Sequence, residues 1–143
     1  MYGRGMKPTS LKMLIVDDDK FIAIMLRDFF KSQDYEIFTA ADGEEALAAC
    51  LEKKPDFIIT DLMLPQMSGV ELIKKLRSME EFAVTPIIAL TAGSSATRDA
   101  ARDAGAHMVL EKPIRRIELQ QKVDELLAAT PFVSQYSPIP SKP

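Results

Sequence analysis

The sequence has very few residues that bind zinc or form disulfides. Cys50 is the one cysteine and His107 the one histidine, and tryptophan is absent. A single cysteine cannot close a disulfide within the chain, and one cysteine with one histidine cannot supply the four ligands of a structural zinc site. We therefore exclude structural zinc, and we expect no histidine-dependent catalytic triad.

Long apolar runs and blocks of basic residues are also missing. No run approaches the roughly 18 apolar residues that cross a bilayer, and the N-terminal MYGRGMKPTS lacks the apolar core of a secretory signal. Lys and Arg number 18 against 21 Asp and Glu, which gives a net charge of −3 with no basic block to follow a phosphate backbone. We expect a cytoplasmic protein that neither inserts into membranes nor binds nucleic acid directly.

The length of 143 residues and the 47% of hydrophobic residues are typical of one folded domain. Short apolar runs, which predict strands, alternate with longer amphipathic stretches, which predict helices. The strands are expected at 13–16, 35–40, 56–60, 86–91 and 107–111. The helices are expected at 21–31, 43–52, 70–79, 96–104 and 114–129.

Five strand–helix alternations with short connections indicate an α/β fold, a single doubly wound (βα)5 domain with a parallel five-stranded sheet. Four strands are apolar almost throughout, whereas YEIFTA (35–40) alternates and is expected nearer an edge. The domain is expected to span 11–129. We expect residues 1–10 to be flexible, and residues 130–143, rich in Pro and Ser, to form a flexible tail or the start of a linker.

Polar side chains follow four of the five predicted strands. Asp17, Asp18 and Asp19 follow the first, Asp61 follows the third, and Thr91 and Lys112 close the fourth and fifth. An acidic triplet alone is more often a solvated turn or a helix cap, and we expect Asp19 to cap the first helix. Carboxyl ends of parallel strands share one edge, however, where crowded carboxylates would repel each other without a cation. This favours a hard divalent ion such as Mg²⁺.

These segments together resemble the receiver domains of two-component response regulators, which are CheY-like proteins. The resemblance is carried by LIVDDD at the first strand, IITDLMLPQMSGVEL around the third, IIALTA at the fourth and AGAHMVLEKP at the fifth. It covers 11–129 and implies the flavodoxin-like strand order of that family. Within the second segment, the loop LPQMSG (64–69) is expected to shape the rim of the site.

The resemblance implies a role for each matching residue. Asp61 would be the phosphoacceptor, and it would hold Mg²⁺ together with Asp18, with Asp17 acting partly through water, and with the backbone carbonyl of Met63.

Three further positions would bind the phosphoryl group or belong to the switch segment. Lys112 would pair with it, Thr91 would hydrogen-bond one of its oxygens, and Ala92 would follow Thr91 in the switch segment. Pro113 would follow Lys112 through a cis peptide bond, which is accessible before proline.

One position departs from the family pattern. Receivers commonly carry an aromatic residue three positions before the Lys-Pro pair, and here that position is Val109. A valine has few rotamers and no hydroxyl, so the inward swing of a ring cannot be the switch. Signalling would then depend on Thr91, the loop after it and the fourth helix.

Two of the predicted helices have features that suggest a role in signalling. The fourth would pack mainly through alanines 96, 100, 101 and 104, and we expect it to be the most mobile helix because alanine buries little area. In the last helix, Leu119, Val123, Leu126 and Leu127 form the core stripe, whereas Ile117 lies on another side. Ile117 would be exposed and, with Val109 nearby, would extend an apolar surface for a partner or a homodimer. An exposed isoleucine without a role is the commoner case.

The leading hypothesis is a phosphoacceptor and not an enzyme, although it would assist its own phosphorylation and dephosphorylation. Its partners would be a histidine kinase or histidine phosphotransfer protein, an unknown downstream protein, and a second copy after phosphorylation. It would act without an output domain of its own. The phosphoryl donor must come from another protein, because His107 is expected to be a surface or packing residue.

Three alternatives stay open. The chain could be cut from a larger regulator or hybrid kinase, or it could be a pseudo-receiver that binds partners constitutively. A small metal-dependent phosphatase would need a further acid or base group, and no unassigned candidate is evident.

Overall fold

The computed structural model describes residues 11–129, so the expectations for 1–10 and 130–143 lie outside the described residues. The strands are β1 (Leu11–Val16), β2 (Tyr35–Ala40), β3 (Phe57–Asp61), β4 (Ile87–Thr91) and β5 (Met108–Glu111). The helices are α1 (Lys20–Phe30), α2 (Gly43–Lys53), α3 (Gly69–Arg77), α4 (Ser95–Ala104) and α5 (Arg116–Ala128), with a short 3₁₀ helix at Glu80–Phe82. The predicted alternation is confirmed.

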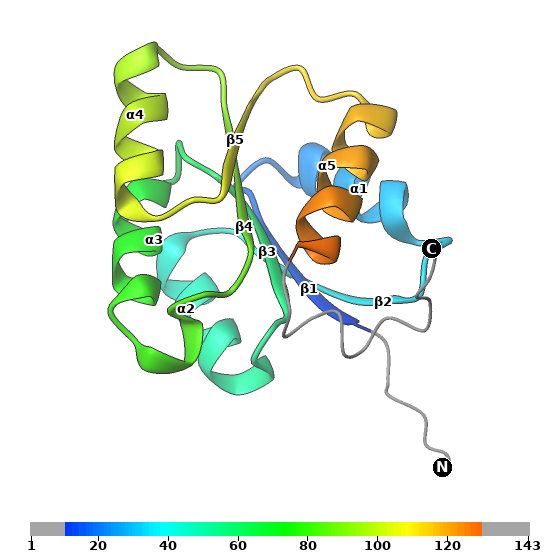
Figure 1. The fold of residues 1–143 in the computed structure, drawn as a ribbon, viewed down its shortest axis with the longest axis horizontal. Coiled ribbons are helices and arrows are strands. Elements are labelled where there is room, and N and C mark those ends of the chain that lie inside the picture. The colour runs from blue at the N-terminus through cyan, green and yellow to red at the C-terminus, as the bar shows by residue number, and fades with distance from the viewer. Residues whose placement is uncertain (1–10, 130–143) are drawn as a thin grey trace.

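All the strands pair in parallel in the order β2-β1-β3-β4-β5. The helices α1 and α5 cover one face of the sheet, and α2, α3 and α4 cover the other (Figure 1). β2 is an edge strand, as its alternating pattern predicts, and β5 is the other edge. From β1 the chain passes to β2 on one side of the sheet and then to β3 on the other side of β1. The point between β1 and β3 is therefore the topological switch point, and open α/β sheets bind ligands there, at the carboxyl ends of the strands.

The side chains of each strand alternate between two apolar cores. Met13 and Ile15 of β1 pack under α1 and α5, whereas Leu14 and Val16 pack under α2, α3 and α4. The strands β3 and β4 are buried along their whole length. This burial on both faces explains their continuous apolar sequences and holds their carboxyl ends rigidly at one edge.

Side-chain caps set where four helices begin. Asp19 caps α1, as predicted, by accepting hydrogen bonds from the N–H groups of Phe21 and Ile22. Asp42, Ser68 and Ser94 accept equivalent bonds at α2, α3 and α4.

The last helix starts later than the predicted residue 114. Arg115, which precedes α5, has an extended backbone (φ −93°, ψ 139°), so the helix begins at Arg116. The short helix Glu80–Phe82 was not predicted, and it buries Phe82 in the core.

The fourth helix buries fewer of its alanines than its sequence suggests. Ala101 and Ala104 are buried, but Ala100 is half-buried and Ala96 is exposed. The prediction of a four-alanine packing face is therefore wrong at its N-terminal end, where Ala96 is exposed and does not pack in the core.

Candidate metal centre

Three carboxylates gather where β1 and β3 end. Asp17 and Asp18 follow β1 directly, and Asp61 is the last residue of the neighbouring strand β3. One carboxylate oxygen of each lies within 4.8 Å of the others. The carboxyl ends of the strands point toward the top of Figure 1. The sequence-predicted acidic residues thus converge, with Asp17 and Asp61 buried and Asp18 exposed.

Asp17 contains an oxygen that no hydrogen-bond donor satisfies. Its Oδ1 accepts a bond of 2.9 Å from the Asp19 N–H, but its Oδ2 is buried without a hydrogen-bond partner. Burial raises the pKa of Asp17, the bond from Asp19 opposes this, and the nearby charge of Asp61 adds to it. A buried carboxylate oxygen without a donor is stabilised by a cation.

Lys112 supplies a positive charge on the other side of Asp61. Its Nζ lies 3.2 Å from Asp61 Oδ2 and 3.7 Å from Asp17 Oδ2. Burial lowers the pKa of Lys112, but the two aspartates outweigh this effect and raise it overall. The ammonium therefore stays protonated beside the carboxylates.

The other oxygen of Asp61 is held by the backbone. The N–H of Met63 donates to Asp61 Oδ1 at 3.1 Å, and the Met63 side chain is 68% exposed. The peptide bond between Lys112 and Pro113 is cis.

The residues present fit a hard divalent ion. Carboxylate oxygens are the ligands that Mg²⁺ prefers, and one or two carboxylates with a carbonyl and waters are its usual protein ligands. Asp17, Asp18 and Asp61 provide such oxygens on a rigid sheet edge, and the unsatisfied Asp17 Oδ2 lies among them.

Thr91 ends β4 and is fully buried. Its Oγ1 accepts a hydrogen bond of 2.8 Å from the N–H of Gly93, and the exposed Ala92 lies between the two. A Cβ atom on Gly93 would lie 3.1 Å from Thr91 Oγ1, so the absence of a side chain allows this close approach. Sequence reasoning missed Gly93, although its place two residues after the strand was the available signal.

Gly69 shapes the site from beneath the loop that connects β3 and α3. A Cβ atom there would lie 2.4 Å from the Asp61 carbonyl oxygen and 2.7 Å from Leu62 Cα. The N–H of Gly69 donates to the Leu62 carbonyl at 3.0 Å. The first turn of α3 therefore packs directly on the backbone that carries Asp61.

Val109 and Ile117 do not lie together. Val109 is buried in the core beneath α4, whereas Ile117 is 71% exposed on α5. The expectation that Val109 extends an apolar surface around Ile117 is wrong. Val109 faces α4 on one side of the sheet, whereas α5, which carries Ile117, covers the other side.

His107 has a polar partner that sequence reasoning did not anticipate. Its Nδ1 contacts the Arg77 guanidinium at 3.1 Å and accepts from the Ile87 N–H at 3.2 Å. Arg77 lies 30 residues earlier in the chain, so no local pattern could indicate the contact.

The family model of the response regulator receiver domain matches residues 13–124. The chain belongs to this family. It is 38% identical over 120 residues to the transcriptional regulatory protein PrrA of Mycobacterium tuberculosis, a match that covers 83% of this chain and 51% of PrrA. The chain spans about half the length of the curated relatives it matches.

Two solved receiver structures share this fold. The chemotaxis response regulator CheY4 of Vibrio cholerae is 34% identical, with a TM-score of 0.78, over 82% of this chain and 99% of CheY4. The receiver domain of the sensor histidine kinase PA1611 of Pseudomonas aeruginosa is 28% identical, with a TM-score of 0.78, over 85% and 100%. Its structure holds a magnesium ion in the active-site cleft.

These comparisons establish a receiver domain of two-component signal transduction with the expected CheY-like fold. Among residues 11–129, no helix combines the length and the apolar character that crossing a bilayer requires.

Proposed function

We propose that this receiver domain accepts a phosphoryl group on Asp61 from a phosphohistidine of a histidine kinase or phosphotransfer protein. The observation that carries the proposal is the convergence on Asp61 of two further carboxylates and the Lys112 ammonium. Receiver domains are phosphoacceptors, and the role of each residue named here is our proposal.

The chemistry follows from the charges around Asp61. A carboxylate oxygen attacks phosphorus, the new O–P bond forms, and the P–N bond to histidine breaks with its electron pair passing to the ring nitrogen. A loose phosphoryl-transfer transition state needs mainly positioning and charge neutralisation. Lys112 neutralises phosphoryl oxygens and orients the carboxylate that it already contacts at 3.2 Å.

Thr91 and the acidic residues complete the site. Asp17, Asp18, Asp61 and the Met63 carbonyl would hold Mg²⁺, which supplies charge neutralisation when bound. Thr91 donates its hydroxyl hydrogen to a phosphoryl oxygen, and as its side chain turns toward that oxygen, Oγ1 moves away from the Gly93 N–H from which it accepts. Ala92 lies beside them without a side chain that would crowd the phosphoryl group.

The intact mass after incubation with acetyl phosphate and Mg²⁺ tests this function. Wild type and an Asp99→Asn control, changed at an exposed position of α4, should each gain one phosphoryl group. Asp61→Asn should gain none, and omission of Mg²⁺ should prevent the gain. An unlabelled wild type would refute the proposal and favour a pseudo-receiver that binds partners constitutively.

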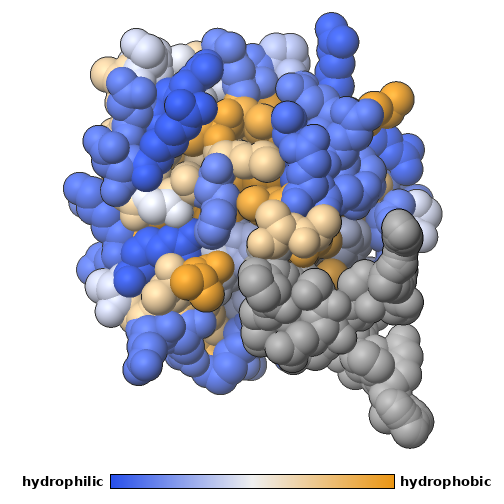
Figure 2. Space-filling model, viewed as in Figure 1, coloured by the Kyte–Doolittle hydropathy of each residue, from blue (hydrophilic) through white to orange (hydrophobic). Residues whose placement is uncertain are grey.

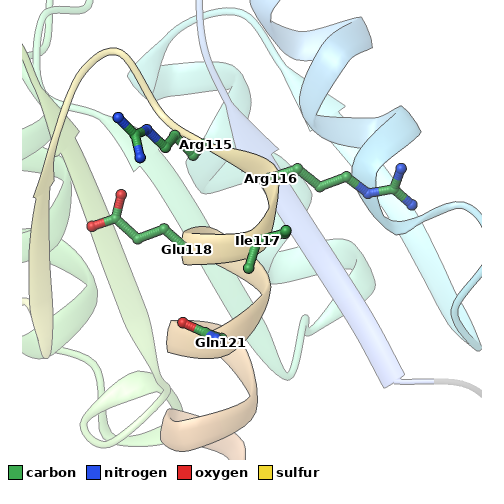
Figure 3. A pocket seen from close by; sticks show the side chains of 5 residues that line it. All are labelled: Arg115, Arg116, Ile117, Glu118 and Gln121. Atoms are coloured by element: carbon green, nitrogen blue, oxygen red, sulfur yellow. The ribbon is translucent and has the colours of Figure 1, made fainter.

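We further propose that phosphorylation acts through protein contacts, including a homodimer that uses Ile117. The isoleucine lines a shallow surface pocket with Arg115, Arg116, Glu118 and Gln121. Figure 3 shows the side chains of Arg116 and Glu118 on opposite sides of Ile117. A two-fold axis that lies in this surface, at right angles to the line from Arg116 to Glu118, would place each Arg116 near a Glu118 of the second copy.

Sedimentation of the protein with and without beryllofluoride, a phosphoryl mimic, tests the dimer. Ile117→Asp should abolish the association that beryllofluoride induces. Leu51→Asp, at an exposed apolar residue of α2, is the matched control and should associate as wild type does. Equal association of all three proteins would show that Ile117 is not part of the dimer interface.

A further inference from the structure

The residues that pack α4 into the apolar core are small. Ala101 and Ala104 are the buried residues of this helix among those described, and Val109 of β5 lies in the same core. Alanines bury little apolar area, and a valine fills less space than an aromatic ring. Polar contacts between α4 and β5 therefore contribute a larger share of what positions this helix.

An ion pair joins α4 to the end of β5. Arg98 Nη2 lies 3.3 Å from Glu111 Oε1, and about two-thirds of the Arg98 side chain is buried. The Nε of Arg98 is buried without a hydrogen-bond partner. The guanidinium is thus partly buried and lacks one of its hydrogen-bond partners. A small displacement of Glu111 would therefore change how strongly Arg98 is stabilised in this position. Figure 2 shows hydrophobic side chains in the gap between α4 and α5, where β5 runs, with hydrophilic side chains on either side.

Glu111 is linked to both phosphoryl-binding residues. It is the cross-strand partner of Thr91, and Lys112 follows it in the chain. The Lys112 N–H donates to the Thr91 carbonyl at 2.8 Å, which connects the ends of β4 and β5. A movement of Thr91 or Lys112 toward a phosphoryl group therefore displaces the backbone that carries Glu111.

The alternation of the strands places Glu111 on the side that faces α4. Ala89 and Val109 both lie in the core beneath α2, α3 and α4. Thr91 and Glu111 each follow two residues later, on the same side of the sheet. One face of the sheet therefore carries the threonine, the valine and the glutamate toward the same helix.

We propose that the Arg98–Glu111 ion pair positions α4 and transmits the state of Asp61 to it, in the place of an aromatic residue at position 109. This inference rests on the proposed phosphorylation of Asp61. When Thr91 leaves the Gly93 N–H and Lys112 leaves Asp17, the end of β5 shifts. The ion pair then opens and releases the first half of α4.

Amide hydrogen exchange of 95–104, measured with and without beryllofluoride and Mg²⁺, tests the proposal. In wild type, beryllofluoride should accelerate the exchange of these amides. In Arg98→Gln and in Glu111→Gln, exchange without beryllofluoride should already be about threefold faster, the change that a partly exposed ion pair supports. The further acceleration by beryllofluoride should fall to less than about half of the wild-type value.

Two controls separate this effect from a general loss of stability. The charge-swapped double variant, Arg98→Glu with Glu111→Arg, should restore slow exchange and the response to beryllofluoride. Glu81→Gln removes the exposed ion pair with Lys54, which lies 2.9 Å away, and should respond as wild type does.

The outcomes distinguish the two proposals. If the single variants bind beryllofluoride and keep the wild-type change in exchange, the proposed role of the ion pair is overturned, but the proposed phosphorylation of Asp61 is not. A loss of response in Glu81→Gln equal to that in Glu111→Gln would overturn it as well. A wild type that acquires no phosphoryl group from acetyl phosphate would overturn the proposed function and this inference together.

Discussion

His107 accepts two hydrogen bonds on one nitrogen, at the end of the sheet opposite the acidic site. The donors are the Ile87 N–H at the start of β4 and the Arg77 guanidinium of α3. Arg77 also donates to the carbonyls of Gly105 and Phe82, at 2.7 to 3.0 Å. Since Nδ1 accepts, the ring proton lies on Nε2, and protonation of Nδ1 would remove the acceptor from both donors.

The cost of losing this acceptor follows from those contacts. In His107→Ala, the partly buried Ile87 N–H loses its bond, whereas Arg77 keeps three bonds to carbonyls. One partly buried unsatisfied donor reduces the free energy of unfolding by about 1 to 2 kcal/mol. In His107→Asn, the amide oxygen lies close to the Nδ1 position, so the loss should stay below about 0.5 kcal/mol.

The same contact predicts the sign of a pH effect. Burial, and then the charge of Arg77, lowers the pKa of His107 below its usual 6.5. The unfolded chain therefore takes up a proton at a higher pH than the folded chain does. Stability from His107 is complete above pH 6.5 and falls as the pH drops through 6.5 toward the folded-state pKa, below which it levels off.

Urea denaturation between pH 7.5 and 5 measures the effect of the substitutions and the effect of pH on the free energy of unfolding. Both appear as changes in the urea concentration at the midpoint, while the dependence of the free energy on urea stays constant. Wild type should be more stable than His107→Ala at pH 7.5, and this difference should shrink toward pH 5. His107→Asn should lack this component of the pH dependence. Parallel curves for wild type and the asparagine variant, or an alanine variant as stable as wild type at pH 7.5, would refute the assigned hydrogen bonds.

Three further predictions concern the site and α4. Gly69→Ala should reduce the free energy of unfolding by about 3 kcal/mol in urea denaturation, because its Cβ would lie 2.4 Å from the Asp61 carbonyl oxygen; a change below about 0.5 kcal/mol would contradict this packing. Lys112→Met should bind Mg²⁺ about tenfold more tightly in isothermal titration calorimetry, because a competing cation 3.2 Å from Asp61 is removed; unchanged or weaker binding would contradict the electrostatic argument. Amide exchange should be faster in 95–104 than in 43–53, because α4 is anchored by two small residues; equal protection would rule out α4 as the mobile helix.

The local sequence pattern determined most of the secondary structure and the edge at which the acids gather. Strands buried on both faces must be apolar throughout, so 57–61 and 87–91 stand out in the sequence. Because parallel strands end at one edge, Asp17 and Asp61 could be placed together before any distance was known. The strand order itself came from the family resemblance, since periodicity within a strand carries no information about its neighbours.

Only the tertiary structure decided which distant residues meet. Arg77 reaches His107, and Arg98 reaches Glu111, across crossovers whose geometry depends on how whole helices pack. The burial of Val109 under α4, away from Ile117, likewise depends on which face of β5 each helix covers. These contacts join residues from different elements through space, and a local pattern of apolar and polar residues cannot specify such pairs.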